Sequence, residues 1–186
     1  MVLQYDRIVE LVQGTTPDSF LLTPQILLEL HRLAIQDIYS CAGRFRTGPV
    51  TLSDGRHSPP PYQQVPPLVD EMCQYVNDDQ TRSPIHLAAY LMWRHNWIHP
   101  FFGGNGRTSR AVSYLVLCSK LGYILPGQKT VTDQIVANRG PYHEALHAAD
   151  DAARDGITDV SKMEEMLSNM LAAQLYYLHQ RATGMQ

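Results

Sequence analysis

Apolar residues recur every three or four positions along much of this chain, the spacing that places them on one face of an α-helix. In the clearest case Thr23 precedes Pro24, a pair that favours the first turn of a helix, and apolar residues at helical spacing continue until Gly43. Similar patterns predict further helices over residues 6–13, 65–76, 84–98, 107–121, 127–137 and 141–154, and from 161 onward. Ser161 and Glu164 have the spacing of a capping box at the start of the last helix.

A different pattern interrupts the helices between residues 44 and 61. Residues 49–52 (Pro-Val-Thr-Leu) have the chemistry of a strand, and residues 53–55 (Ser-Asp-Gly) have that of a turn. The prolines at 59–61 exclude both a helix and a central strand. We therefore predict a β-hairpin flap with an extended exit, although composition alone also fits an ordinary connecting loop.

Length and composition fit one globular domain over residues 1–186. The formal net charge is −3, and no basic cluster is present, so we expect no nucleic-acid partner. The most apolar run, residues 112–125, is interrupted by Ser119 and Lys120 and is too short for a membrane span. The predicted fold class is all-α: a compact helical bundle with one small β-hairpin.

The cysteines point to a reducing environment. Cys41, Cys73 and Cys118 are odd in number and far apart, which supports neither a disulfide framework nor a metal knuckle. Residues 1–14 contain charged side chains within their apolar pattern, so we expect no signal peptide. Together these features lead us to expect a cytoplasmic protein.

The most informative segment is residues 99–110, which read HPFFGGNGRTSR. Glycines flank Asn105 and leave backbone N–H groups uncovered where a helical pattern begins. The N-terminus of a helix attracts anions, because its first N–H groups lack partners and the helix dipole is positive there. Arg107 and Arg110 are three residues apart, so they share a helix face on which both can bind phosphate oxygens.

Two residues at the start of this segment have distinct predicted roles. His99 lies just ahead of the glycine-rich turn, where an imidazole that titrates near neutrality could accept a proton from an attacking hydroxyl. A buried histidine satisfied by backbone groups is the alternative for His99. Phe101 is predicted to be a structural anchor that holds the loop in the core.

The segment resembles the signature of Fic (Fido-domain) proteins, which reads HPF, a turn with an acidic residue, then GNGR, two positions and a final arginine. The matching residues are His99, Pro100, Phe101, Gly104, Asn105, Gly106, Arg107 and Arg110. Gly103 stands where the family normally has Asp or Glu to hold Mg²⁺. Glycine at 106, instead of lysine, is similar to the nucleotide-transferring branch and unlike the Doc branch. The resemblance covers roughly the entire chain.

The resemblance implies a protein adenylyltransferase that moves AMP from ATP to a Ser, Thr or Tyr hydroxyl of a target protein. His99 would be the general base. The backbone amides of Gly104, Asn105 and Gly106 would hold the α-phosphate, and Arg107 and Arg110 would bind the β- and γ-phosphates.

The same resemblance implies ATP as substrate and a target protein docked at the 44–61 flap. It also implies an inhibitory or antitoxin-like protein as a further partner. Because Gly103 has no side chain to coordinate a metal, we expect Mg²⁺ to be held loosely.

Other functions stay open. A nucleotide-binding or partner-binding module would keep the phosphate loop and lose the metal, and removal of AMP or transfer of another phosphate-linked group would use the same site. His143 to His147 also read HExxH, the motif in which two histidines bind zinc and the glutamate activates water, with Glu164 or Glu165 as a possible third ligand.

Overall fold

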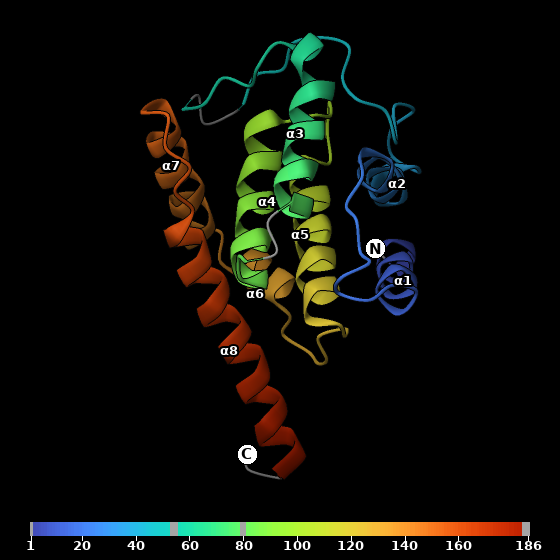
Figure 1. The fold of residues 1–186 in the computed structure, drawn as a ribbon, viewed down its shortest axis with the longest axis vertical. Coiled ribbons are helices and arrows are strands. Elements are labelled where there is room, and N and C mark those ends of the chain that lie inside the picture. The colour runs from blue at the N-terminus through green and yellow to red at the C-terminus, as the bar shows by residue number, and fades with distance from the viewer. Residues whose placement is uncertain (1, 53–55, 79–80, 184–186) are drawn as a thin grey trace. The chain divides into compact units, whose positions relative to one another are not determined.

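The computed structural model describes residues 2–52, 56–78 and 81–183, and within these ranges the backbone forms helices and no strand (Figure 1). The predicted all-α class is thus confirmed. Backbone contacts divide the chain into two compact units, residues 1–123 and 124–186. The single domain over residues 1–186 stays a prediction. No helix in the described ranges is long and apolar enough to cross a membrane.

The first unit contains the helices around the glycine-rich loop: α1 (Val2–Gln13), α2 (Pro24–Ile35), the short 3₁₀ helix η1 (Tyr62–Gln64), α3 (Val65–Asp78), α4 (Pro84–Ile98) and α5 (Asn105–Leu121). Helix α5 packs against α4, α2 and α1, and α3 packs against α4. Side chains such as Leu27, Leu30, Met72 and Leu115 are completely buried. Burying one such side chain stabilises the fold by about 1.5–3 kcal/mol relative to leaving it exposed, so this packing fixes the two helices that flank the loop.

Several helix ends form as the sequence predicts. The hydroxyls of Thr23 and Ser83 accept hydrogen bonds from the backbone N–H groups three residues later, at 3.4 and 3.1 Å. Gly122 ends α5 in the left-handed conformation, with φ +82°, and its N–H donates to the carbonyl of Cys118. These ends form locally because each needs only a few consecutive residues.

Helix α2 ends earlier than the apolar pattern predicts. Its last residue is Ile35, and the chain then turns so that Ile38 is 59% exposed and the N–H of Gly43 donates to Nδ1 of His31 at 3.0 Å. The prediction of a helix to Gly43 is therefore wrong. The buried imidazole of His31 gains a hydrogen bond from this turn, which a continuous helix could not supply.

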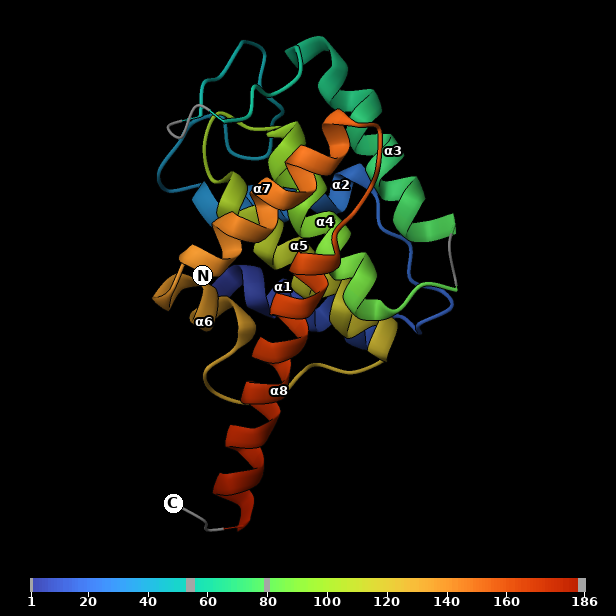
Figure 2. The same cartoon turned by 90° about the vertical axis from the view of Figure 1, so that its left-hand side faces the viewer.

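The second unit contains α6 (Val131–Ala137), α7 (Gly140–Arg154) and α8 (Ser161–Thr183), and the C-terminal half of α8 extends beyond both other helices (Figure 2). Helix α6 begins later than predicted, after a capping box formed by Thr130 and Asp133. Helix α8 begins at Ser161, and the carboxylate of Asp159 accepts a hydrogen bond from the Ser161 N–H at 2.9 Å. Ser161 therefore lies inside the helix instead of capping it.

The predicted β-hairpin is not formed in residues 44–52 and 56–61, and its predicted turn at 53–55 lies outside the described residues. The side chain of Arg46 lies between the two arms and donates to the carbonyls of Gly48 and Pro60. These carbonyls are therefore bound by a guanidinium and not by a partner strand. An isolated two-stranded hairpin is only marginally stable, and the prolines lack N–H donors for a ladder. We refer to this stretch below as the 44–61 segment.

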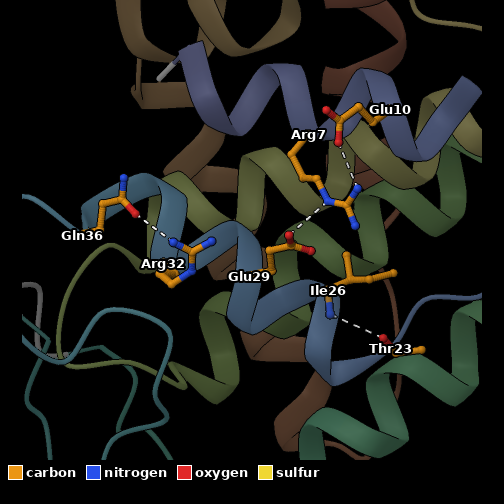
Figure 3. A network of polar contacts seen from close by, with 7 residues as sticks. All are labelled: Arg7, Glu10, Thr23, Ile26, Glu29, Arg32 and Gln36. Atoms are coloured by element: carbon orange, nitrogen blue, oxygen red, sulfur yellow. Dashed lines mark hydrogen bonds and ion pairs between the residues drawn. The ribbon is translucent and has the colours of Figure 1, made fainter.

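An ion pair between α1 and α2 helps to fix the helix that supports the loop (Figure 3). Arg7 on α1 lies 3.1 Å from the carboxylate of Glu29 on α2 and 3.0 Å from that of Glu10 on its own helix. These groups are partly exposed, so each pair contributes at most about 1 kcal/mol. The contact joins α2, which carries His31, to α1.

Candidate functional site

Residues 99–104 form the loop between α4 and α5. His99 ends α4 in the left-handed conformation, with φ 49° and ψ 60°, and its N–H donates to the carbonyl of His95 at 2.9 Å. A residue with a Cβ pays about 1–2 kcal/mol for this conformation, so the surrounding structure must hold it in place. The backbone at His99 is thus a constrained position at the entrance of the loop.

Phe101, the predicted anchor of the loop, is completely buried. Its ring stacks on the imidazole of His31, with centroids 3.6 Å apart and planes 5° apart, and lies 5.7 Å from the ring of Phe45. Because Nδ1 of His31 accepts from Gly43, its Nε2 carries the proton and donates to the carbonyl of Gly103 at 3.0 Å. Sequence reasoning did not identify His31, which no local motif marks.

The side-chain amide of Asn105 closes the loop on itself. Its oxygen accepts from the N–H of Phe101 at 3.0 Å, and its nitrogen donates to the carbonyl of Phe101 at 2.8 Å. Gly104 adopts φ +77°, and a Cβ there would lie 2.9 Å from Cγ2 of Ile35. Asparagine at 105 and glycine at 104 are therefore both required by the geometry of this turn.

Helix α5 begins at Asn105 without a capping side chain. Its first backbone N–H groups have no acceptor within the helix, and the helix dipole is positive at this end. An anion placed here would accept hydrogen bonds from the backbone. The start of α5 therefore has the character of an anion-binding site.

The two arginines of the motif occupy different environments. Nη1 of Arg107 donates to the carbonyl of Ala34 at 3.1 Å, near the end of α2. Nη1 of Arg110 lies 3.4 Å from the position that a Cβ on Gly106 would occupy. Arg110 therefore folds back over the first turn of α5, whereas Arg107 is partly engaged by α2.

His99 is neutral at physiological pH. Burial lowers the pKa of His99 to about 4, the positive charge of Arg46 and the nearby ring of His57 act in the same direction, and a hydrogen bond to the carbonyl of Asn96 opposes them. That hydrogen bond requires one ring nitrogen to carry the proton, which leaves the other as an acceptor. The imidazole can therefore take up a proton from a hydroxyl group beside it.

The residues around Gly103 do not fit the metal site of the family. Gly103 has no carboxylate, and a Cβ there would lie 3.4 and 3.5 Å from two ring carbons of Tyr39. Within the described residues, no three His, Cys, Asp or Glu side chains cluster as a metal site. Gly103 is not among the glycines with positive φ, so a side chain at this position meets no backbone strain.

The HExxH sequence lies on α7, in the second unit. His143 and Glu144 are exposed, and the rings of His143 and His147 are 6.3 Å apart. In the part of the chain that the structure describes, no third ligand joins this pair. The structure therefore does not assemble the zinc site that the motif would need.

The fold and the loop define a helical protein in which a neutral histidine lies a few residues before the uncapped N-terminus of a helix. Residues 21–117 match the Fic/DOC family, which is 97 of the 186 residues, and the chain belongs to this family.

Sequence relatives match part of the chain. It is 30% identical over 134 residues to the protein adenylyltransferase Fic of Drosophila persimilis, covering 69% of this chain and 26% of that protein. It is 32% identical over 129 residues to the protein adenylyltransferase fic-1 of Caenorhabditis elegans, covering 66% and 23%. The chain thus spans about a quarter of the length of these relatives.

Solved structures share the fold. A Fic domain containing signaling protein from Bacteroides thetaiotaomicron matches with a TM-score of 0.78 and 24% identity, covering 99% of this chain and 71% of that one. A Fic family protein from Desulfovibrio desulfuricans G20 matches with a TM-score of 0.73 and 24% identity, covering 97% and 53%.

The state of His99 can be measured directly. An NMR titration of the histidine ring signals, with the His99 signal assigned through His99→Gln, is expected to give a midpoint near pH 4, because burial disfavours the imidazolium. A midpoint near the usual value of about 6.5 would show that His99 is solvated and that this burial is wrong.

Proposed function

We propose that this chain is a protein adenylyltransferase that moves AMP from ATP to a Ser, Thr or Tyr hydroxyl of a target protein. The observation that supports this function best is the neutral imidazole of His99 beside the uncapped start of α5. Membership of the Fic/DOC family and relatives named adenylyltransferases point to the same reaction.

In the proposed reaction, the hydroxyl oxygen of the target forms a bond to the α-phosphorus of ATP. The bond from that phosphorus to the oxygen bridging to the β-phosphate breaks, and pyrophosphate leaves. His99 takes the proton of the hydroxyl. The protein would contribute positioning and electrostatic stabilisation, as is usual in phosphoryl transfer.

The phosphates would be bound by the backbone and by the two arginines. The N–H groups of Gly104, Asn105 and Gly106 would hold the α-phosphate, and Arg110 would bind the departing phosphates from its place over the first turn of α5. Arg107 would contribute the donors that its bond to Ala34 leaves available. The 44–61 segment would dock the target.

A nucleotide-binding domain without transfer is the second candidate, and Gly103 is the observation that favours it. Labelled ATP incubated with the chain and a cell lysate, followed by mass spectrometry of modified residues, separates the two candidates. Transfer of AMP to hydroxyl side chains supports the enzyme. ATP binding in calorimetry without any modified protein supports the binding domain.

The His99→Ala variant is expected to lose AMP transfer by about 10²- to 10⁴-fold, because the general base is removed. Its affinity for ATP should stay nearly the same, since the base acts on the acceptor. Transfer is measured with labelled ATP, and affinity by calorimetry. His143→Ala is the matched control: it should transfer at the wild-type rate, whereas a zinc hydrolase built on HExxH would lose activity. Full transfer by His99→Ala would exclude the proposed base.

The Arg110→Ala variant is expected to bind ATP about 10- to 100-fold more weakly, since a hydrogen bond to a charged group contributes about 1.5–3 kcal/mol. AMP should lose much less affinity, because the lost contact is to the distal phosphates. Arg32→Ala removes an exposed arginine that bonds Gln36 on α2, and serves as the control for net charge. Equal losses for AMP and ATP would contradict the placement of Arg110.

The Gly103→Asp variant is expected to raise Mg²⁺-dependent AMP transfer by about tenfold or more, because it restores a carboxylate ligand. The backbone at Gly103 accepts a side chain, and the Cβ would make ordinary contact with the ring of Tyr39. Gly103→Asn is the uncharged control, and thermal melts check folding. A folded Gly103→Asp variant no faster than Gly103→Asn would show that the absent acid does not limit the reaction.

A further inference from the structure

One buried guanidinium connects the 44–61 segment to the loop that contains His99. Arg46 is 3% exposed, and burial lowers its pKa, so its charge requires compensation by hydrogen bonds. Its side chain donates to the backbone carbonyls of Gly48, Pro60, Ile98 and His99. Its own backbone N–H donates to the carbonyl of Pro100 at 2.8 Å. An arginine on the protein surface would not need these hydrogen bonds, because water would solvate its charge.

The acceptors include the end of α4, where helix carbonyls lack partners. The carbonyl of Trp97 accepts from Nε2 of His57 at 2.7 Å. The next two carbonyls accept from Arg46, at 3.4 Å for Ile98 and 2.8 Å for His99. The 44–61 segment therefore supplies side-chain donors to consecutive carbonyls at the helix end.

The shorter of the two hydrogen bonds from the Arg46 guanidinium to the end of α4 is made to His99, the residue with the constrained backbone. Nε of Arg46 binds the carbonyl of His99, whose backbone is left-handed. Rotation about ψ of His99 would turn this carbonyl away from the guanidinium and break the bond. The contact therefore offsets part of the conformational cost of about 1–2 kcal/mol at His99.

We propose that Arg46 is a positioning residue that fixes the backbone of His99 to the 44–61 segment. The segment that would dock the acceptor and the base that would deprotonate it are then held at a fixed distance by one side chain. The role of His99 in this inference rests on the proposed function, whereas the contacts of Arg46 do not depend on it.

Substitutions at Arg46 can separate the effect of its positive charge from the effect of its hydrogen-bond geometry. The positive charge of Arg46 disfavours the imidazolium of His99, and His57 acts in the same direction. His95, which also interacts with His99, is completely buried, and burial lowers its pKa to about 3, so it is neutral. A lysine at 46 keeps the charge but loses the planar fork of donors, whereas a methionine loses both.

The experiment compares Arg46→Lys and Arg46→Met with the same two changes at Arg139, an exposed arginine just before α7. Arg46→Lys is expected to lower kcat for AMP transfer by about tenfold to a hundredfold through misplacement of the base, with ATP affinity within about twofold of the wild type. The Arg139 variants should match the wild type. Wild-type kcat in Arg46→Lys, or a parallel fall in ATP affinity, would overturn the proposal.

The titration of His99 provides a readout that a merely structural role of Arg46 would not move. In Arg46→Met the pKa of His99 should rise from about 4, but not to its usual value, because burial is the larger cause. In Arg46→Lys it should stay low. An unchanged midpoint in a folded Arg46→Met variant would contradict the contact. A wild type without transfer would count against the proposed function alone, and this titration would still decide the role of Arg46.

A measurement on the wild type covers the case in which both variants unfold. The Nε–H of Arg46 should give a slowly exchanging NMR signal, because it is buried and bonded to the carbonyl of His99. The Nε–H of Arg139, which is exposed, should exchange fast. Fast exchange at Arg46 would overturn the proposal without any variant.

Discussion

The burial of one aromatic ring fixes the loop on which the site depends. Phe101 cannot leave the core without opening a cavity, and truncation of a buried phenylalanine to alanine typically costs about 3–5 kcal/mol. Asn105 binds both backbone groups of Phe101, so the position of the ring sets the position of the first turn of α5. His31 stacks on the ring and also holds the carbonyl of Gly103. The path of the glycine-rich turn is therefore a consequence of core packing.

The parts of this fold that the sequence predicts correctly are those that a few neighbouring residues decide. The caps at Thr23 and Ser83 and the stop at Gly122 all span three or four positions. The predictions are wrong where a side chain that is distant in the sequence determines the backbone conformation. Residues 49–52 have the chemistry of a strand, but Arg46 binds backbone carbonyls of both arms of the 44–61 segment and no ladder forms there. The apolar spacing after Ile35 continues that of α2, but the bond between Gly43 and His31 turns the chain away.

The same division applies to the candidate site. The motif alone predicts roles for His99, the glycines and both arginines, because their spacing along the chain is itself the signal. It does not reveal that Arg107 is partly bound by Ala34, or that Tyr39 lies beside Gly103, since both contacts depend on where α2 ends. These contacts change the chemistry that can be expected. The donor of Arg107 that binds Ala34 is not available to a phosphate, and a side chain at Gly103 would contact the ring of Tyr39.

This loop joins two helix ends of opposite polarity, and they differ in whether side chains bind their backbone groups. The C-terminal end of α4 has the negative partial charge of the helix dipole, and the N-terminal end of α5 has the positive one. At α4, Arg46 and His57 bind the carbonyls, whereas α5 has no capping side chain.

If the carbonyls at α4 were left uncovered, they would repel a phosphate held by the amides of α5, only a few residues away. Binding them from the 44–61 segment removes that repulsion and also places a positive charge beside His99, which favours the neutral imidazole that a general base requires. The segment before the motif therefore contributes to the charge around His99 as well as to the backbone of the loop.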